Sequence, residues 1–392
     1  MDLVQAELLI SIYRPNFLWV PNGSLDNFSK AHVVYSNWNY SLIKNNSDKL
    51  FLNNDLALLL TTSGSTGSPK LVRISYKNLI SNAKSIAKYL NITERERPIT
   101  SLPMNYSYGI SVINSHLVNG AKILLTNYSV VQKEFWDFAK NQKATSIAGV
   151  PYTYQMLKAI RFCNMELPYL KTLTQAGGKL PSYIVREFSD YAEKFNKRFF
   201  VMYGQTEATA RISYLPFNMC KEKPESIGIP IPGGEFSIID LITKKTITEA
   251  NIPGELVYKG PNVSLGYSLD VLDLADGDLN LGKLNTGDIA YMDEDGFYFI
   301  TGRLKRFIKI FGNRVNLDEV EQILLARDIE CACIGVDDKL IVYTTLENKS
   351  DEILNLLTSK LKFNIRAFEI RIISQIPKNS SGKILYSQLL EK

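Results

Sequence analysis

The alternation of short apolar runs with amphipathic helical segments most constrains the fold of this chain. Strand-like apolar runs occupy residues 56–60, 122–126, 145–150 and 199–202, and helical periodicity occupies residues 78–89, 135–143 and 152–161. Alternation of this kind predicts a mostly parallel sheet that is covered by helices.

The pattern changes after about residue 226. Short runs at 235–240, 254–259 and 296–300 are separated by Pro, Gly, Asn and Asp, which favours antiparallel hairpins. Beyond Arg303, Asn316 and Glu319 have the spacing of a capping box before a helix. The remaining segments predict a hairpin, a helix, a strand and a last helix, at residues 331–336 with 340–346, 351–361, 369–373 and from 384 onward. We therefore expect an α/β fold with a large domain at 1–302, made of mixed, mostly parallel sheets with helices and a small antiparallel part. A small α+β domain at 303–392 follows it.

Composition excludes several classes of protein. The 392 residues include 45 Lys plus Arg against 40 Asp plus Glu, a mild excess that does not indicate a nucleic-acid partner. Four cysteines and two histidines indicate neither a disulfide framework nor a zinc site. No apolar run reaches the roughly 18 residues that a membrane span needs, and the first residues lack a basic leader. A reduced, cytoplasmic enzyme is the expectation.

Residues 62–70 form a run of hydroxyl side chains and glycines that ends in Lys70. Glycines let the main chain approach a ligand closely, and the hydroxyl and N–H groups with the Lys70 ammonium suit phosphate oxygens. An ordinary Ser/Thr/Gly-rich turn is the alternative. The spacing does not fit a Walker loop, because Gly64 and Gly67 are three positions apart and Lys70 does not follow a glycine.

Residues 62–70 resemble the signature T-S-G-[ST]-T-G-x-P-K of adenylate-forming enzymes, which include acyl-CoA synthetases, peptide-synthetase adenylation domains and luciferases. Six further segments are similar to motifs of that family and come in the family's order: Tyr203-Gly204-Gln205-Thr206-Glu207, Gly254-Glu255-Leu256 with Gly260 and Gly266-Tyr267, Thr286-Gly287-Asp288, Gly302-Arg303, Ile308 to Val315 with Glu319-Val320-Glu321, and Pro377 to Lys383. Ordered motifs over residues 62–383 are not expected by coincidence.

The resemblance implies roles for individual residues around Mg-ATP. The β- and γ-phosphates would be held by the first motif, through Thr62, Ser63, Gly64, Ser65, Thr66, Gly67 and Lys70. Thr206 would donate its hydroxyl to phosphate, and Glu207 would hold Mg²⁺ as an oxygen ligand. Adenine would lie against Tyr203 and Gly204 and in a slot lined by Gly177, Gly178 and Lys179. Asp288 would accept both ribose hydroxyls, supported by Arg303.

In the family, the small C-terminal domain is mobile and brings one lysine to the reacting groups. By resemblance this lysine is Lys383, which would reach the α-phosphate and the carboxylate. The domain then swings about a hinge so that the acceptor can enter, and Lys305 occupies the hinge position. A solvated surface lysine is the alternative for Lys383 considered alone.

The acid would bind along residues 102–112, which line the acid pocket in the family. Tyr106 stands where relatives place a His or an aromatic residue that gates the carboxylate. Amino-acid-activating domains carry an Asp at the position of Gly109 as a counter-ion for the ammonium group. Because an uncompensated buried ammonium is costly, a neutral acyl, hydroxyacyl or aryl acid fits better.

The expected function is ATP-dependent activation of a carboxylic acid to an acyl-adenylate, followed by acyl transfer to the thiol of CoA or of a carrier-protein phosphopantetheine arm. An acyl carrier protein is therefore a candidate partner. The alternatives are amino-acid adenylation and a non-catalytic nucleotide-binding remnant. The last alternative arises because only 61 residues precede the first motif, fewer than in typical relatives, and Tyr386 stands where the terminal motif often has an Arg.

Overall fold

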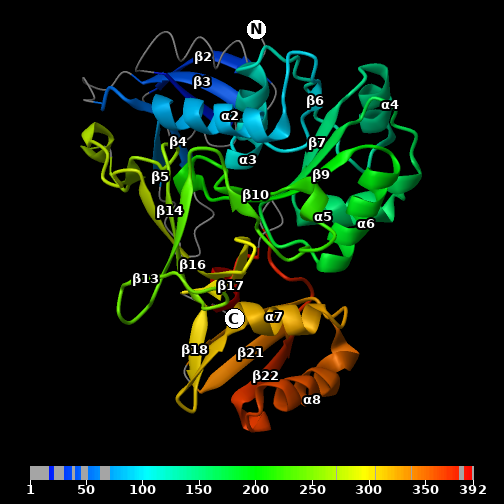
Figure 1. Ribbon diagram of the computed structural model, residues 1–392, viewed down its shortest axis with the longest axis vertical. Helices are drawn as coiled ribbons and strands as arrows, with labels where there is room; N and C mark the ends of the chain where they lie inside the picture. The colour runs from blue at the N-terminus through cyan, green and yellow to red at the C-terminus, as the bar shows by residue number, and fades with distance from the viewer. Residues whose placement is uncertain are drawn as a thin grey trace.

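The computed structural model shows two lobes, and the lower lobe contains the last part of the chain (Figure 1). It describes residues 17–21, 31–37, 40–45, 52–61, 71–270, 272–304, 306–336, 338–378 and 384–390. No helix in these ranges is long and apolar enough to cross a membrane. The expected α/β class, with a large mixed part followed by a small α+β part, is confirmed.

A six-stranded sheet forms the centre of the upper lobe. Its first four strands are parallel, and the last two pair antiparallel at one edge. In chain order they are β6 (Pro98–Ile99), β7 (Ser146–Gly149), β8 (Thr172–Gln175), β9 (Arg198–Tyr203), β10 (Ser213–Leu215) and β11 (Ile229–Pro230). The predicted parallel sheet is therefore present.

Helices cover both faces of this sheet because side chains alternate along its strands. Phe199 packs with α4 (Lys133–Asn141), α5 (Pro151–Ala159) and α6 (Ser182–Lys194) on one face. Its neighbour Phe200 packs with α2 (Tyr76–Leu90) and α3 (Ser107–Leu117) on the other. Helix α2 begins at a reciprocal cap in which the Ser75 and Asn78 side chains each accept from the other's backbone N–H.

Three antiparallel sheets complete the upper lobe. One contains β4 (Leu56–Thr61), β5 (Leu71–Ser75) and β15 (Gly266–Ser268). A five-stranded sheet contains β12 (Glu235–Ile239), β13 (Thr246–Ile247), β14 (Gly254–Lys259), β16 (Lys283–Met292) and β17 (Tyr298–Arg303). The third contains β1 (Phe17–Pro21), β2 (Ala31–Asn37) and β3 (Tyr40–Asn45).

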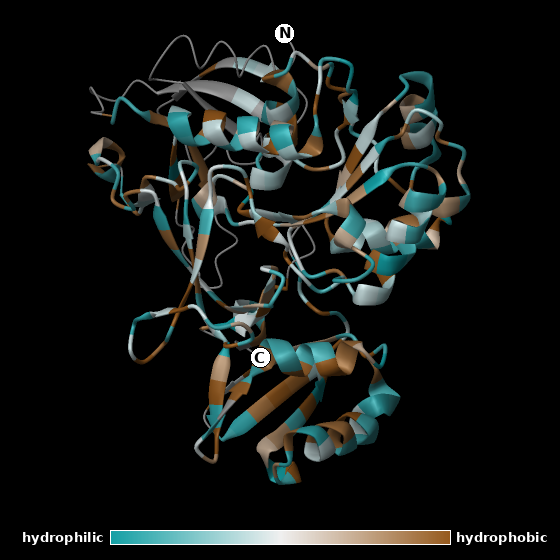
Figure 2. Ribbon diagram, viewed as in Figure 1, coloured by the Kyte–Doolittle hydropathy of each residue, from teal (hydrophilic) through white to brown (hydrophobic). Residues whose placement is uncertain are grey.

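The lower lobe has an apolar core of its own, formed between helices and a three-stranded sheet. Its elements are the hairpin β18 (Phe307–Ile310) and β19 (Asn313–Asn316), then α7 (Leu317–Leu325), β20 (Cys331–Val336), β21 (Lys339–Thr344), α8 (Ser350–Leu361), β22 (Phe368–Ile372) and α9 (Ser387–Leu390). Figure 2 shows hydrophobic residues along the strands of this sheet, whereas hydrophilic residues occupy one side of α7 and α8. The predicted hairpin at 331–346 is confirmed.

Three local predictions differ from the structure. Residues 122–126 form only a single bridge, from Leu124 to Ile99, although apolar residues flank Leu124 on both sides. The sequence pattern also missed β5, in which Arg73 interrupts the apolar run although it is fully buried. Asn316 does cap α7, but it accepts from the N–H of Asp318, and no reciprocal bond from Glu319 is present between these described residues.

The buried His116 of α3 provides a test of the packing between α3 and the sheet. Burial lowers the pKa of His116, although the carbonyl of Val112, 2.7 Å from Nδ1, and the charge of Glu96 act in the opposite direction. Below the unfolded pKa of about 6.5, the unfolded chain therefore binds a proton that the folded protein does not.

Lowering the pH from 7.5 to 5.5 should consequently reduce the free energy of unfolding by about 1 kcal/mol more in the wild type than in His116→Gln. Urea unfolding at the two pH values measures the difference. A His32→Gln variant gives the contribution of the chain's other histidine. Equal pH dependence in wild type and His116→Gln would contradict the buried, neutral assignment.

Candidate active site

The carboxyl ends of β7, β8 and β9 lie at one edge of the central sheet, where parallel sheets bind ligands. After β8, the chain turns at Gly177, whose φ of +86° suits glycine. After β9, it enters the short helix η3 (Thr206–Ala208). The two turns therefore place Gly177 and Thr206 at the same edge.

Asp288 is the most completely coordinated acidic residue at this edge. It is 2% exposed and lies on β16, in the neighbouring antiparallel sheet. The Tyr203 hydroxyl and the Gln205 amide, at 2.8 Å, donate to its Oδ2, and Arg303 Nε donates to Oδ1 at 3.0 Å. Gln205 also donates to the carbonyl of Thr286 at 3.0 Å. These bonds join the end of β9 to β16 and β17.

Arg303 faces Asp288 directly across the antiparallel pair of β16 and β17. The Asp288 charge raises the pKa of Arg303, and burial beside Asp288 raises the pKa of Tyr203 well above its usual value. Tyr203 therefore remains a neutral hydroxyl donor at physiological pH. Its side chain also packs against a buried cluster that includes Ile212 and Tyr258, so the core holds the ring in place.

The loop from Gly204 to Arg211 turns back so that the N–H of Ile212 donates to the carbonyl of Tyr203 at 2.9 Å. A Cβ on Gly204 would lie 1.6 Å from the carbonyl oxygen of Ala210, so only glycine fits there. Thr209 has a φ of +68°, an unfavourable conformation for a β-branched residue. The loop must therefore be held by contacts from outside it.

Asn262 supplies those contacts. Its side-chain amide donates to the backbone carbonyl oxygens of Ala208 and Arg211, at 2.9 Å each. Its backbone carbonyl accepts from the Thr209 hydroxyl at 2.7 Å. Its Oδ1 accepts from the Tyr258 hydroxyl at 2.7 Å. Asn262 is 1% exposed and fixes the loop that carries Thr206 and Glu207.

Thr206 and Glu207 lie between the start of α3 and strand β15. The Thr206 hydroxyl donates to Ser107 Oγ at 3.3 Å, and Glu207 Oε1 accepts from the Tyr267 hydroxyl at 2.7 Å. No group of three or more metal-ligating side chains occurs in the ranges that the structure describes. A single carboxylate such as Glu207 still fits Mg²⁺, which keeps several waters and commonly binds one or two carboxylates together with phosphate oxygens.

Tyr106 precedes α3 and approaches the turn after β8. A Cβ on Gly177 would lie 2.5 Å from the Tyr106 hydroxyl, so glycine at 177 makes room for this side chain. Burial raises the pKa of Tyr106. Gly178 and Lys179 are exposed beyond this contact, and the carbonyl of Gly178 accepts from Gln175 at 2.8 Å.

Gly109 packs directly on the main chain of the preceding loop. A Cβ at this position would lie 2.0 Å from the carbonyl oxygen of Pro103 and 3.1 Å from that of Leu102. No larger side chain fits here without a shift of the backbone. The position therefore carries neither an acidic group nor space for one.

Several predicted site residues lie outside the described residues: Thr62, Ser63, Gly64, Ser65, Thr66, Gly67 and Lys70, the hinge residue Lys305, and Lys383. The residues that flank the first motif, Thr61 and Leu71, pair with each other between β4 and β5. Strand β5 in turn pairs with β15, where Val72 lies opposite Tyr267. The structure brings together Tyr106, Gly177, Tyr203, Gly204, Thr206, Glu207, Asp288 and Arg303.

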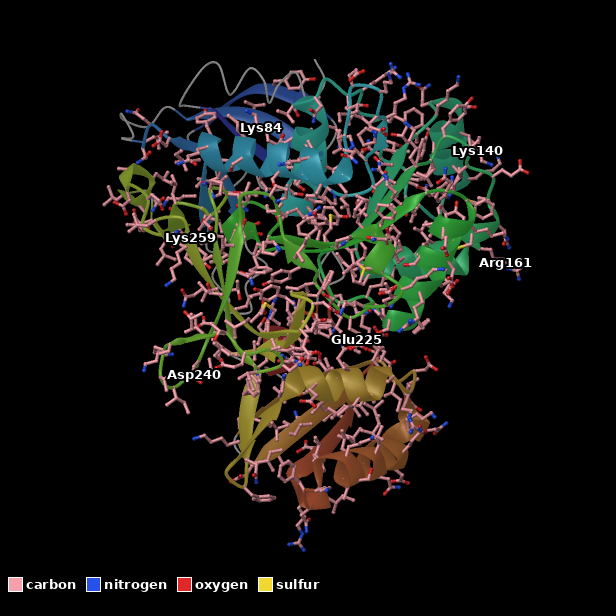
Figure 3. All side chains as sticks on the ribbon, viewed as in Figure 1. Lys84, Lys140, Arg161, Glu225, Asp240 and Lys259 are labelled. Carbon is pink, nitrogen blue, oxygen red and sulfur yellow. The ribbon has the colours of Figure 1, made fainter. Side chains whose placement is uncertain are left out.

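Sequence reasoning missed the roles of Gln205, Asn262 and Tyr267 in this site. Gln205 and Tyr267 fall within matched motifs, but nothing in the motif spacing indicates contact with Asp288 or Glu207. Asn262 lies between Gly260 and Gly266, and an asparagine in a glycine-flanked loop is the one sequence signal for it. Figure 3 shows that other charged side chains, such as Lys140 and Arg161, project from the periphery of the upper lobe.

Residues 19–268 match the family described as AMP-binding enzyme. The chain belongs to this family. The resemblance to adenylate-forming enzymes that the ordered motifs indicated is therefore confirmed.

Among its relatives, oxalate–CoA ligase of Arabidopsis thaliana is 30% identical over 84% of this chain and 66% of its own length. Luciferin 4-monooxygenase of Luciola mingrelica is 29% identical over 84% of this chain and 62% of its own length. 2-Succinylbenzoate–CoA ligase of Bacillus licheniformis is 29% identical over 86% of this chain and 70% of its own length. The chain thus spans less than two thirds of the first two of these relatives.

The fold is similar to that of O-succinylbenzoate coenzyme A synthetase from Bacillus subtilis, solved in complex with AMP. The TM-score is 0.73 at 25% identity, and the match covers 86% of this chain and 70% of that one. The two lobes of this AMP-binding enzyme therefore have a solved counterpart over most of the chain described here.

Replacing Asn262 by Ala should release the loop between Gly204 and Ile212. Two buried carbonyl oxygens and the Tyr258 hydroxyl would lose their partner, which should lower the free energy of unfolding by about 3 kcal/mol. Urea unfolding measures this loss, and the amide of Ile212 should exchange its hydrogen faster.

Asn280→Ala is the matched control for Asn262→Ala. The Asn280 amide also donates to a backbone carbonyl, that of Ser264 at 2.9 Å, but within the described residues its hydrogen bonds do not reach the loop. It should leave the exchange rate of the Ile212 amide unchanged. Equal hydrogen-exchange rates of the Ile212 amide in wild type and Asn262→Ala would show that Asn262 does not hold the loop.

Proposed function

We propose that this AMP-binding enzyme activates a carboxylic acid with ATP, forms an acyl-adenylate and pyrophosphate, and then transfers the acyl group to a thiol. The supporting observation is that Gln205, which binds Asp288, immediately precedes Thr206 and Glu207. The loop that binds the group suited to a ribose therefore also carries the groups suited to phosphate and Mg²⁺.

The nucleotide is proposed to lie across the edge formed by β8, β9 and β16. Asp288 would accept the ribose hydroxyls, and Arg303 would keep its carboxylate oriented. Adenine would occupy the space by Gly177, Gly178, Lys179, Tyr203 and Gly204. To bind the ribose, Asp288 exchanges one of its present donors, Tyr203 or Gln205, for a nucleotide hydroxyl. A charged acceptor with replaceable neutral donors suits such an exchange.

The triphosphate and Mg²⁺ are assigned to the hydroxyl-rich loop at 62–70, to Thr206 and to Glu207. Mg²⁺ supplies neutralisation of the phosphate charge when it is bound. Thr206 would donate its hydroxyl to a phosphate oxygen, and Tyr267 would orient the Glu207 carboxylate through the 2.7 Å hydrogen bond. Because the attacking carboxylate and the triphosphate repel each other, positioning and charge neutralisation carry the catalysis.

The acid would enter beside Tyr106, with its carboxylate towards Thr206. Amino-acid adenylation is less well supported, because the contact of Gly109 with Pro103 excludes an acidic counter-ion there. CoA is the first candidate for the acceptor, since oxalate–CoA ligase and 2-succinylbenzoate–CoA ligase are relatives by name. A carrier-protein phosphopantetheine arm is the second candidate, with an acyl carrier protein as partner.

We further propose that residues 1–302 and 303–392 act as two domains with a hinge near Lys305. The support is the separate apolar core of the second part, which contains Ile310, Val320, Leu324 and Val342 among its buried residues. Swinging this part about the hinge would bring Lys383 to the reacting carboxylate and α-phosphate. It would then remove Lys383 so that the thiol can enter.

The proposed function is tested by pyrophosphate exchange into ATP across a panel of carboxylic acids. Lys383→Ala should lower the acid-dependent exchange rate by about 100-fold or more, as for a lost oxyanion donor. Lys378→Ala is the matched control from the same segment, because Lys378 forms an ion pair with Glu330 and should be dispensable. Absence of exchange with every acid of the panel would favour a non-catalytic nucleotide-binding protein instead.

Lys305→Pro tests the hinge. Proline restricts φ and should impede the rotation that follows adenylation. The variant should retain pyrophosphate exchange, and its rate of acyl-thioester formation should fall about 10-fold or more. Chromatography of the thioester measures this rate. Equal loss of both half-reactions would contradict a hinge at this position.

A further inference from the structure

Arg211 ends the same loop that carries Thr206 and Glu207, and its guanidinium is buried. The residue is 3% exposed, and its Nε has no hydrogen-bond acceptor among the residues that the structure describes. The guanidinium instead lies 3.7 Å from the centre of the Tyr108 ring on α3, a cation–π contact. Arginine keeps its charge in proteins, so a full positive charge is buried here without a carboxylate partner in the described part of the chain.

Arg73 shows how this protein satisfies a buried arginine that has a structural role. Arg73 is fully buried, and its guanidinium donates to four carbonyl oxygens, those of Leu265, Tyr267, Asp276 and Gly277. Among the described residues, Arg211 has the Tyr89 hydroxyl as a hydrogen-bond neighbour but no comparable set of acceptors. Burying a charge that lacks an anion is costly, and the arrangement therefore points to an anion that comes from outside the chain.

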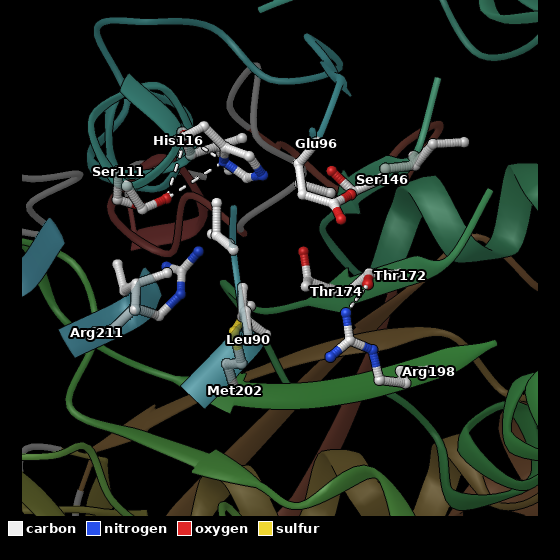
Figure 4. Close-up of a pocket in the computed structure, with 16 residues that line it drawn as sticks. Leu90, Glu96, Ser111, His116, Ser146, Thr172, Thr174, Arg198, Met202 and Arg211 are labelled. Atoms are coloured by element: carbon white, nitrogen blue, oxygen red, sulfur yellow. Dashed lines mark hydrogen bonds between the residues drawn. The ribbon is translucent and has the colours of Figure 1, made fainter. Parts of the chain in front are cut away.

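Arg211 lines an internal cavity between α2, α3 and the central sheet (Figure 4). The cavity also contains Glu96, His116 and Arg198. Glu96, its one lining carboxylate, is paired with Lys171 at 3.2 Å, and Arg198 donates to Thr172 Oγ1 at 2.9 Å. Figure 4 shows Arg211 directed into this space below Ser111. The charge around the cavity is therefore positive, and Glu96 is not left to neutralise Arg211.

The size of the cavity restricts the anion. Its volume is about 20 Å³, which corresponds to one or two water-sized groups. The two oxygens of a carboxylate are on this scale, whereas a phosphate or sulfonate is larger. A small terminal carboxylate fits the cavity best.

The position of Arg211 distinguishes this anion from the carboxylate that reacts. The reacting group must meet the nucleotide near Thr206 and Tyr106, at the open edge of the sheet. Arg211 packs on Tyr108, two residues further into α3, and Tyr108 is itself fixed by hydrogen bonds from its hydroxyl to Thr174. The centres of the Tyr106 and Tyr108 rings are 6.3 Å apart, and Arg211 lies against the Tyr108 ring, so the two places are close to each other. An acid that reacts at Tyr106 could thus extend towards Arg211.

We propose that Arg211 binds a second, non-reacting carboxylate of the acid, so that the enzyme prefers short dicarboxylic acids to monocarboxylic acids. This inference rests on the proposed function, and it names the class of substrate. Arg211 would act as a specificity-determining residue, since a buried charged group discriminates strongly against a substrate that leaves it unpaired.

The test compares pairs of acids in which the distal carboxylate of one is replaced in the other by a methyl ester or a methyl group. Succinate and monomethyl succinate, glutarate and pentanoate, and adipate and hexanoate form such pairs. In the wild type, pyrophosphate exchange should show a kcat/KM at least 30-fold higher for the dicarboxylate in one or more pairs. This comparison needs no variant and therefore does not depend on how a substitution folds.

Arg211→Met should remove the preference, and Arg211→Lys should retain part of it because the charge remains. Arg73→Met is the matched control, because it also removes a buried guanidinium but should leave the ratio within each pair unchanged. Circular dichroism establishes that each variant is folded. If Arg211→Met does not fold, the wild-type pairs and Arg211→Lys decide the result.

Each other outcome overturns a definite statement. If the monocarboxylic acid of every pair supports equal or faster exchange, the role of Arg211 is overturned while the proposed function stays intact. An equal loss for all acids in Arg211→Met would assign Arg211 to the reacting carboxylate and overturn the inference. Absence of exchange with every acid in the wild type would overturn the proposed function, and the inference would fall with it.

Discussion

The buried carboxylate of Asp288 is the constraint on which the site depends. It is 2% exposed, and donors from two sheets converge on it: Tyr203 and Gln205 from the end of β9, and Arg303 from β17. These bonds join the parallel sheet to the five-stranded antiparallel sheet, as does the bridge between Gly228 and Tyr298. The edge where a nucleotide would bind therefore lies at the joint between the two sheets.

The loop after β9 has a backbone conformation that its own residues do not favour. Thr209 has a positive φ, and Gly204 tolerates no Cβ, so the loop relies on Asn262 for its shape. The loop presents Thr206 and Glu207 at one end and the buried Arg211 at the other. Strain at such a place is common where chemistry requires fixed geometry.

The sequence predicted the parallel sheet and its helices because their apolar periodicity is local, and it identified the family because the motifs are contiguous. It could not predict β5, because an arginine in a short apolar run normally indicates a solvent-facing position. The four carbonyl groups that accept from the buried Arg73 belong to residues 265–277, far along the chain. The roles of Asn262 and Arg211 were missed for the same reason. Both depend on contacts between segments far apart in the chain, which no local pattern contains.

We propose that Asp288 exchanges one of its present donors for the ribose of a bound nucleotide. A crystal structure with a non-hydrolysable acyl-adenylate analogue tests this exchange most directly. We expect ribose hydroxyls within hydrogen-bond distance of the Asp288 carboxylate, with Tyr203 or Gln205 displaced from it and Arg303 retained. A nucleotide bound elsewhere, with Tyr203, Gln205 and Arg303 all still on Asp288, would contradict it.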